Sequence, residues 1–253
     1  YPDLAPVTGY THPVYGQAGL EASLDDYLRG EAGNPSLVVW WNHILYGQPP
    51  PGLDVRLSID LNLQRKADNA LSNHRGALVL INAESGEILA MASHPTYDPN
   101  LVAVQDDELA GDVLRYLDSM PGKPLLANAY QERYMPGSTF KIVTTTVGLE
   151  TGKVDMMSVF KDERAWVPPN TKKPIRNYGK KVCGGDLAEV FRRSCNIPFA
   201  QMAVDIGPDL MVNGANRFGF DERIPFDLPG AAASTFGGTA VDFVDSLALL
   251  AIH

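Results

Sequence analysis

A serine and a lysine stand three residues apart in residues 134–141, at a point where the sequence predicts the start of a helix. The two residues before the serine, a proline and a glycine, favour a turn, and residues 142–150 form a largely uncharged run suited to a buried helix. Because residues i and i+3 share one face of a helix, we expect the Ser138 hydroxyl and the Lys141 amine to come within hydrogen-bonding reach. The chain can therefore place a nucleophile beside its own base.

This pair can react only if the lysine is neutral. A serine hydroxyl is a poor nucleophile until a base takes its proton, so the pKa of Lys141 must fall from about 10.4 through burial or a positive field. The apolar Phe140 and the positive end of the helix dipole both favour a lower pKa, and backbone N–H groups there could hold an oxyanion. The alternative is that Ser138 only caps the helix and Lys141 is a surface cation. A lysine in the first helical turn is electrostatically unfavourable, which favours the catalytic interpretation.

A second pair, Ser194 and Asn196, flanks a cysteine in a short break between two predicted helical segments. These segments are residues 186–193 and 197–204. The Ser194 hydroxyl could relay a proton between Lys141 and an amine, and the Asn196 amide could orient both the lysine and a substrate carbonyl. Taken alone, such residues are usually helix caps. The order S-x-x-K then S-x-N, with 52 residues between Lys141 and Ser194, favours one catalytic site.

These motifs resemble those of the penicillin-binding proteins, the transpeptidases of cell-wall synthesis. Residues 76–93 resemble the opening hairpin of that family's domain, and residues 97–100 resemble the segment after it. Residues 56–71 resemble its entry strand and first helix, with Asp60 as the expected cap. Residues 19–21 and 28–30 resemble the pedestal of class B members, those without a glycosyltransferase of their own. The resemblance therefore covers most of the chain.

The family's third motif, K-T/S-G, does not occur in the 253 residues. The resemblance implies that this motif lies on a sheet strand facing the serine, where it binds the substrate carboxylate and helps to form the oxyanion hole. Residues 151–153 hold similar residue types in another order and are expected to end the helix of Ser138. The chain stops in a sequence that resembles a region before that strand. We therefore expect a C-terminally incomplete domain that acylates poorly by itself.

The predicted fold class is α+β, with an antiparallel sheet flanked by helices and a helical lobe, as in β-lactamases and transpeptidases, lacking its C-terminal strands. A proline-rich stretch at residues 48–52 marks the expected boundary. Residues 1–52 are predicted to be an N-terminal pedestal or linker segment, and residues 53–253 the transpeptidase domain. Helices are expected from about residue 106 to the end, with residues 161–181 as an exposed excursion near the site.

Three aromatic residues of the pedestal segment could contact either a membrane partner or the main domain. They are Trp40, Trp41 and Tyr46. Packing against the main domain is the favoured interpretation, because large aromatic side chains are highly buried on average.

Charge and hydropathy argue against a nucleic-acid-binding surface and against a membrane-spanning segment in this sequence. The formal net charge is −9 with scattered lysines and arginines, which argues against a nucleic-acid surface. The sequence contains no run of about 20 apolar residues, which is the length needed to span a membrane. The resemblance places the whole protein on the extracytoplasmic face of the cytoplasmic membrane, with its anchor outside this chain.

The two cysteines and five histidines do not predict a metal site, because no histidine pair has i, i+4 spacing. An extracytoplasmic setting would permit a disulfide between Cys183 and Cys195. Two unpaired, buried thiols are the favoured state, since sequence alone does not establish connectivity.

The resemblance implies acyl transfer through a covalent serine ester. Lys141 takes the proton of Ser138, which attacks the carbonyl between the two terminal D-alanines of a peptidoglycan stem peptide. Ser194 passes the proton to the leaving D-alanine, Asn196 holds the acyl amide, and an amine of a neighbouring stem completes the crosslink. A β-lactam enters the same first step and leaves a slowly hydrolysed adduct. Besides these ligands, the implied partner is a membrane glycosyltransferase, and no cofactor is needed.

Four rival functions stay open at this point. A serine β-lactamase can share the first motif, S-T-F-K, but usually has an apolar residue in place of Asn196 and lacks a pedestal. A D-alanyl-D-alanine carboxypeptidase uses the same nucleophile with water as the acceptor, and the pedestal again argues against it. The missing third motif leaves room for a β-lactam sensor or for a catalytically silent scaffold that docks a glycosyltransferase.

Overall fold

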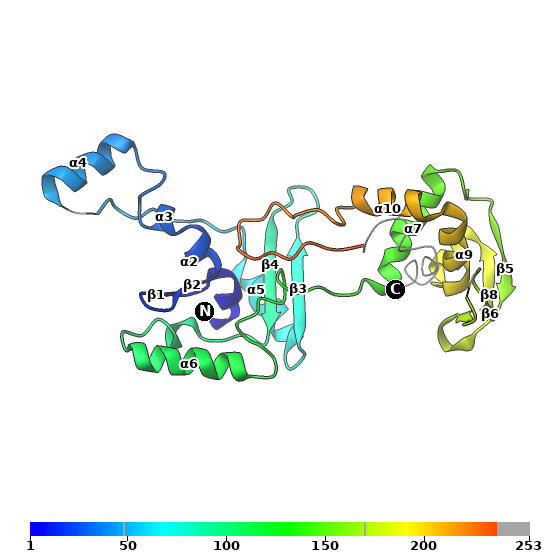
Figure 1. Cartoon of the computed structure of the whole chain (residues 1–253), viewed down its shortest axis with the longest axis horizontal. Helices are drawn as coiled ribbons and strands as arrows, with labels where there is room; N and C mark the ends of the chain where they lie inside the picture. Colours follow the sequence, from blue (N-terminus) through cyan, green and yellow to red (C-terminus); the bar gives the residue numbers. More distant parts are fainter. Residues whose placement is uncertain (48, 170, 237–253) are drawn as a thin grey trace. The chain divides into compact units, whose positions relative to one another are not determined.

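The computed structural model describes residues 1–47, 49–169 and 171–236. The described chain divides into two compact units (Figure 1). Unit 1 comprises Tyr1–Arg133 and Pro225–Ala232, and unit 2 comprises Tyr134–Ile224 and residues 233–236. All four candidate catalytic residues therefore belong to unit 2.

A β-hairpin forms the centre of unit 1. Strands β3 (Gly76–Ile81) and β4 (Ile88–His94) pair antiparallel, with Gly76 opposite His94 at one end and Ile81 opposite Ile88 at the other. The turn between them is stabilised by the Asn82 side chain, which accepts hydrogen bonds from two backbone N–H groups of the turn. The predicted hairpin at residues 76–93 is confirmed.

Helix α5 (Leu61–Leu71) packs against this hairpin (Figure 1). It begins as predicted at Asp60, whose carboxylate accepts hydrogen bonds from the first backbone N–H groups of the helix. The predicted entry strand before α5 is wrong, because residues 53–60 form no strand. Only two hydrogen bonds join this segment to β4, from Ser58 Oγ and from the Asp60 N–H, and two such bonds do not make a ladder.

The remaining elements of unit 1 are mostly short. They are the 3-10 helices η1 (Pro2–Leu4) and η2 (Pro99–Leu101), strands β1 (Thr11–His12) and β2 (Gly16–Gln17), and helices α1 (Ala5–Thr8), α2 (Gly19–Ser23), α3 (Asp25–Leu28), α4 (Ser36–Tyr46) and α6 (Asp107–Ser119). Helix α6 buries Leu117 beside Val102 and Tyr97. The predicted boundary between residues 52 and 53 lies inside unit 1 and stays a prediction.

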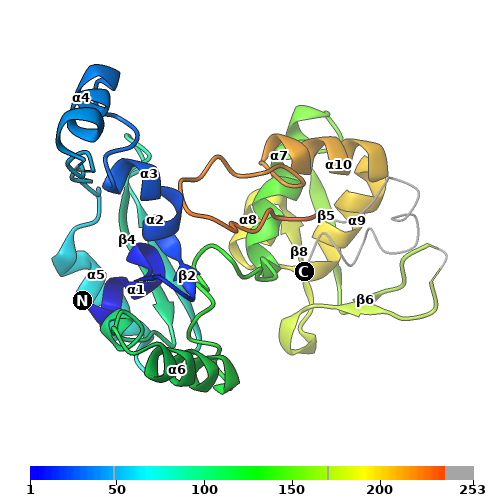
Figure 2. The same ribbon diagram turned by 60° about the vertical axis from the view of Figure 1, so that its left-hand side comes forward.

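Helix α4 stands apart from the other elements of unit 1 in both views (Figures 1 and 2). Trp40 is 53% exposed and Trp41 is 50% exposed, and Tyr46 is also exposed. The expectation that these aromatics pack against the main domain is therefore wrong. The two tryptophan rings contact each other instead, with centroids 6.2 Å apart.

Three helices enclose the core of unit 2. Helices α7 (Lys141–Glu150), α9 (Asn196–Ile206) and α10 (Pro208–Arg217) contact one another (Figure 2). Their buried side chains, together with those of the neighbouring strands, form one apolar cluster that includes Val147, Phe199 and Met211. This cluster fixes α7 against α9, the two helices that begin at the predicted motifs.

Short strands and helices complete unit 2. They are the 3-10 helices η3 (Gly137–Phe140) and η4 (Tyr178–Lys180), strands β5 (Val159–Glu163), β6 (Ala165–Trp166), β7 (Ile175–Arg176) and β8 (Cys183–Asp186), and helix α8 (Leu187–Arg192). Strand β5 pairs antiparallel with β8, and β6 with β7. The β5–β8 pair approaches closely at Gly184, where a Cβ would lie 2.6 Å from the backbone of Lys161. Only glycine fits there without displacing the strand.

The α+β class is confirmed, since helices are combined with four two-stranded antiparallel sheets in the described residues. The expectation of helical segments from about residue 106, with residues 161–181 as an exposed excursion, is wrong in one respect, because strands β5 to β8 lie in residues 159–186. This segment lacks the helical period, and its glycines permit the close strand pairing described above. The last part of the expected run, residues 237–253, lies outside the described residues.

Candidate active site

Ser138 lies in the single turn η3, and Lys141 is the first residue of α7. Gly137 opens the turn with a φ of +56°, a conformation that glycine adopts without steric cost. Ser138 is exposed. Among the described residues its hydroxyl makes no hydrogen bond, so the expected Ser138–Lys141 bond is not formed. The lysine amine is instead held by the second motif.

The amine of Lys141 is surrounded by three oxygen atoms of the second motif. Its Nζ lies 2.8 Å from the backbone oxygen of Ser194, 3.1 Å from Ser194 Oγ and 2.8 Å from Asn196 Oδ1. The two carbonyl-type oxygens only accept hydrogen bonds and can take both N–H groups of a neutral amine. The Ser194 hydroxyl can donate a hydrogen bond to the lone pair of the neutral Lys141 nitrogen. The arrangement thus accommodates a neutral lysine as well as a charged one.

Burial lowers the pKa of Lys141 to about 8. The residue is only 2% exposed, so water stabilises its charged form poorly. Nζ also lies 5.3 Å from the centroid of the Phe199 ring, a contact that favours the charged form but is weaker than the loss of hydration. With this pKa, roughly one lysine in ten is neutral at pH 7, against less than about one in a thousand for an exposed lysine.

Ser194 occupies a left-handed position at the end of α8. Its φ is +53°, its N–H donates to the Phe191 oxygen, and the next N–H donates to the Val190 oxygen. Glycine usually fills this place in a helix C-cap, and an L-residue there costs about 1 kcal/mol. The strain turns the backbone so that both the carbonyl and the hydroxyl of Ser194 reach Lys141. The backbone strain therefore lies within the candidate site.

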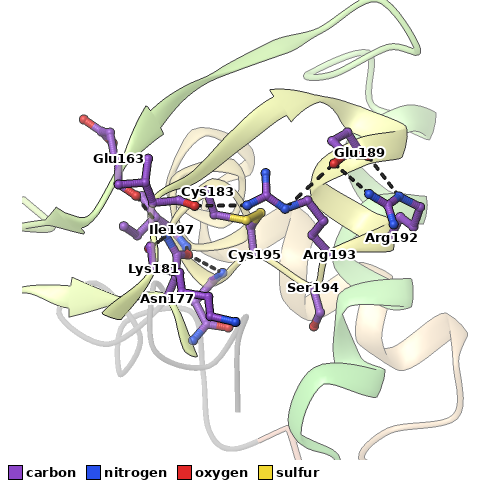
Figure 3. Close-up of a disulfide and its surroundings, with 12 residues drawn as sticks. Glu163, Asn177, Lys181, Cys183, Glu189, Arg192, Arg193, Ser194, Cys195 and Ile197 are labelled. Carbon is purple, nitrogen blue, oxygen red and sulfur yellow. Dashed lines mark hydrogen bonds and ion pairs between the residues drawn. A yellow bond between two sulfur atoms is a disulfide. The ribbon is translucent and has the colours of Figure 1, made fainter. Parts of the chain in front are cut away.

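A disulfide joins Cys183 to Cys195, the residue between Ser194 and Asn196 (Figure 3). The expectation of two unpaired thiols is therefore wrong. The start of β8 lies beside the start of α9, which places the two Cα atoms 5.8 Å apart, within the range of disulfides. The hydroxyl of Ser194 points away from the sulfur atoms (Figure 3). The bridge thus ties the residue between Ser194 and Asn196 to the start of β8.

A further residue, Asn177, holds the second motif and was missed by the sequence interpretation. Its Oδ1 accepts a hydrogen bond of 2.8 Å from the Asn196 N–H, and the neighbouring Arg176 oxygen accepts one of 3.0 Å from Asn196 Nδ2. Both lie in the segment interpreted as an exposed excursion, residues 161–181. The alternation of the apolar Ile175 with polar neighbours was the available indication that this part of the excursion is anchored in the core.

No group of three or more histidine, cysteine, aspartate or glutamate residues in the described part of the chain is arranged to hold a metal ion. Among the same residues, none of the helices has the length and apolar character needed to cross a membrane. The site is built from uncharged hydroxyl and amide groups around one lysine.

A serine at the start of a helix, a buried lysine of lowered pKa and a second motif that holds it form the arrangement expected of the penicillin-binding class. Residues 76–244 match the family model described as "Penicillin binding protein transpeptidase domain", a range that includes all four predicted site residues. The chain belongs to this family.

Curated relatives carry the names of cell-wall enzymes. The chain is 34% identical over 247 residues to the peptidoglycan D,D-transpeptidase PbpA of Mycolicibacterium smegmatis, covering 94% of this chain and 50% of that protein. It is 31% identical over 229 residues to the peptidoglycan D,D-transpeptidase MrdA of Acinetobacter baumannii, covering 88% of this chain and 34% of that protein. The chain thus spans half the length of these relatives or less.

Solved structures show the same fold. The crystal structure of PBPA from Mycobacterium tuberculosis superimposes with a TM-score of 0.90 at 29% identity, covering 99% of this chain and 58% of that one. A penicillin G acyl-enzyme complex of penicillin-binding protein A from the same organism matches with a TM-score of 0.89 at 29% identity, covering 99% and 59%.

Proposed function

We propose that the whole protein is a peptidoglycan D,D-transpeptidase that works through a serine acyl-enzyme. Ser138 is the nucleophile, Lys141 its base, Ser194 the proton relay and Asn196 the group that orients the lysine and the substrate. The observation that carries this proposal is the buried Lys141 amine, held by Ser194 and Asn196 three residues after a serine. The names of the relatives support the substrate class.

The first half-reaction forms the acyl-enzyme. Neutral Lys141 accepts the proton of Ser138 as the serine oxygen attacks the carbonyl carbon between the two terminal D-alanines of a stem peptide. The tetrahedral intermediate collapses, the bond to the terminal D-alanine breaks, and its nitrogen takes a proton. Ser194 Oγ, 3.1 Å from the lysine amine, passes that proton on and recovers it from Lys141. The lysine is then neutral again.

The second half-reaction forms the crosslink. An amine from a neighbouring stem peptide attacks the ester carbonyl and gives up a proton through the same groups in reverse. The new amide bond replaces the ester bond, and Ser138 regains its proton. A β-lactam acylates Ser138 in the first step, but its adduct blocks the acceptor. The reaction with a β-lactam thus stops at the acyl-enzyme.

The setting of this reaction belongs to the same proposal. The whole protein works on the extracytoplasmic face of the cytoplasmic membrane, where the stem peptides are, and docks with a membrane glycosyltransferase that makes the glycan strands. The disulfide between Cys183 and Cys195 supports an oxidising compartment.

The test is a product analysis with the whole protein, a stem pentapeptide donor and a second stem carrying a free amine. Mass spectrometry should find one crosslinked dimer for each D-alanine released, and none with Ser138→Ala. Release of D-alanine without a dimer would instead indicate a carboxypeptidase, and rapid β-lactam hydrolysis a β-lactamase. A stable β-lactam adduct without any peptide product would indicate a sensor, and no reaction with either ligand a scaffold.

A further inference from the structure

The start of α9 carries the second motif, and its backbone donors need partners. The first N–H groups of a helix have no acceptor within the helix. Here the Cys195 N–H donates to the Val190 oxygen, and Pro198 has no N–H, so the donors that require an acceptor are those of Asn196 and Ile197. The cap residue itself, Cys195, is bridged to Cys183 and makes no side-chain hydrogen bond to the helix.

Asn177 supplies the missing cap from another segment of the chain. Its Oδ1 accepts hydrogen bonds from the N–H of Asn196 at 2.8 Å and of Ile197 at 3.1 Å. Its Nδ2 donates to the oxygens of Glu163 at 2.9 Å and Lys181 at 3.2 Å. The Asn177 side chain is buried, and all of its hydrogen-bonding capacity is used (Figure 3). It thus joins β5 and the end of η4 to the start of α9.

The same contacts set the orientation of the Asn196 side chain. The backbone oxygen of Arg176, next to Asn177, accepts a 3.0 Å hydrogen bond from Asn196 Nδ2. Because the amide group is planar, a fixed Nδ2 also fixes the direction of Oδ1. That oxygen lies 2.8 Å from Lys141 Nζ. A continuous set of hydrogen bonds therefore runs from the last residue of β7 through Asn196 to Lys141.

We propose that Asn177 is a positioning residue, which holds Asn196 in the rotamer and place that present its oxygen to Lys141; this inference rests on the function proposed above. Asn177 does not touch the reacting atoms. It acts through Asn196, and its removal takes the acceptor from two N–H groups at the base of the motif. A shift of about 1 Å in a catalytic group can lower a rate about 100-fold.

The test separates positioning from simple stability by a double-mutant cycle in the whole protein. The four forms are wild type, Asn177→Ala, Asn196→Ala and the double variant, and two quantities are measured on each. These are the rate constant for acylation by benzylpenicillin and the free energy of unfolding. We expect Asn177→Ala to lower the acylation rate at least about tenfold in the wild type and less than about twofold in the Asn196→Ala background.

The loss of stability should behave differently. The backbone N–H groups capped by Asn177 persist in Asn196→Ala, so Asn177→Ala should destabilise both backgrounds alike. The matched control is Asn128→Ala, which removes another fully buried asparagine, in unit 1, and should leave the acylation rate unchanged. Equal fold losses of acylation in both backgrounds would overturn the proposal. If Asn177→Ala does not fold, Asn177→Asp is measured instead. It keeps the acceptor oxygen and loses only the donors to Glu163 and Lys181, so its acylation rate should stay within about twofold of wild type even where its stability falls, and a tenfold loss of rate would overturn the proposal.

A second readout does not depend on the proposed function. NMR hydrogen exchange of the Asn196 side-chain NH₂ reports its bond to the Arg176 oxygen. Exchange should quicken at least about tenfold in Asn177→Ala but not in Asn128→Ala. If wild type is not acylated but this difference is present, the proposed function fails and the positioning role stands. Unchanged exchange overturns the positioning role whatever the activity.

Discussion

Oδ1 of Asn196 accepts a hydrogen bond of 2.8 Å from the amine of Lys141, across 55 residues of sequence. This bond joins the two motifs in one site inside unit 2. With the Ser194 backbone oxygen, it occupies two N–H groups of the lysine and leaves the third direction to a hydroxyl. The lysine can therefore exchange protons with a serine while its position is held by groups that do not titrate.

The acylation rate should depend on pH through Lys141. Burial lowers the pKa of this amine from 10.5 to about 8, and only the neutral form accepts the Ser138 proton. The rate constant for β-lactam acylation of the whole protein should thus rise about tenfold per pH unit below pH 8 and level off above it. Stopped-flow kinetics between pH 6 and 9.5 measures this profile. A flat profile, or a rise that continues to pH 10, would contradict the assignment, and Lys141→Arg should be inactive throughout.

The free energy of unfolding should rise with pH between the folded and the unfolded pKa of Lys141. In the unfolded chain Lys141 holds its proton up to its ordinary pKa of 10.5, whereas the folded chain releases it near pH 8. The unfolded state therefore binds more protons between these two values, and the free energy of unfolding gains a contribution that increases with pH. Urea titrations of wild type and Lys141→Met at pH 7.5 and 9.5 isolate it. The increase should be larger in wild type than in the variant, and equal increases would argue against burial as the cause.

Two substitutions of Ser194 should separate its backbone strain from its chemistry. Ser194→Gly relieves the positive φ, whereas Ser194→Ala keeps it, so the glycine variant should be more stable by about 1 kcal/mol. Both variants remove the hydroxyl 3.1 Å from Lys141 and should lower the crosslinking rate of the whole protein by about 100-fold or more. Urea unfolding and product analysis give the two quantities. A glycine variant that keeps its activity would show that the hydroxyl is not the relay.

The disulfide should contribute more to the free energy of unfolding than to the acylation rate. It closes a loop with a sequence separation of 12, for which chain entropy predicts a stabilisation of about 3 kcal/mol. The double variant Cys183→Ser, Cys195→Ser should lose that amount in urea unfolding. Asn196 is still held by Asn177 in this variant, so its acylation rate should fall less than that of Asn177→Ala. The reverse order would mean that the bridge, not Asn177, positions the motif.

Helix α4 should tolerate polar substitution. Trp40 and Trp41 are half exposed, so changing both to glutamine should alter the free energy of unfolding by less than about 0.5 kcal/mol each. Phe199 is the matched control, because it is fully buried in the core of unit 2 and its change to alanine should cost about 3–5 kcal/mol. Thermal and urea unfolding of this chain measure both. A large loss in the tryptophan variant would mean that α4 is packed after all.

The parts of the structure that were predictable are those set by local sequence. The Asp60 cap, the hairpin at residues 76–93 and the start of α7 at Lys141 each depend on residues close in the chain. The meeting of Lys141 with Ser194 and Asn196 was expected from the order of the two motifs and from the family resemblance, since the spacing itself shows only that an activated serine is possible.

The parts that were missed depend on contacts between distant segments. The Cys183–Cys195 bridge requires β8 to start beside α9, and Asn177 reaches α9 from a segment without any helical or strand period. Neither placement can be deduced from the spacing of residues. The exposure of Trp40 and Trp41 was missed because large aromatic side chains are highly buried on average, and the sequence does not show whether a core lies within their reach.

The central claim is that Ser138 is the acylated nucleophile. Intact-mass spectrometry after incubation with benzylpenicillin, followed by peptide mapping, tests it on this chain and on the whole protein. The account predicts one adduct per molecule of whole protein, located on Ser138 and absent in Ser138→Ala and Lys141→Arg. The adduct should be retained in Thr139→Ala, because the neighbouring Thr139 hydroxyl donates a hydrogen bond to the Pro136 oxygen. An adduct on another residue, or a whole protein that stays unmodified, would contradict it.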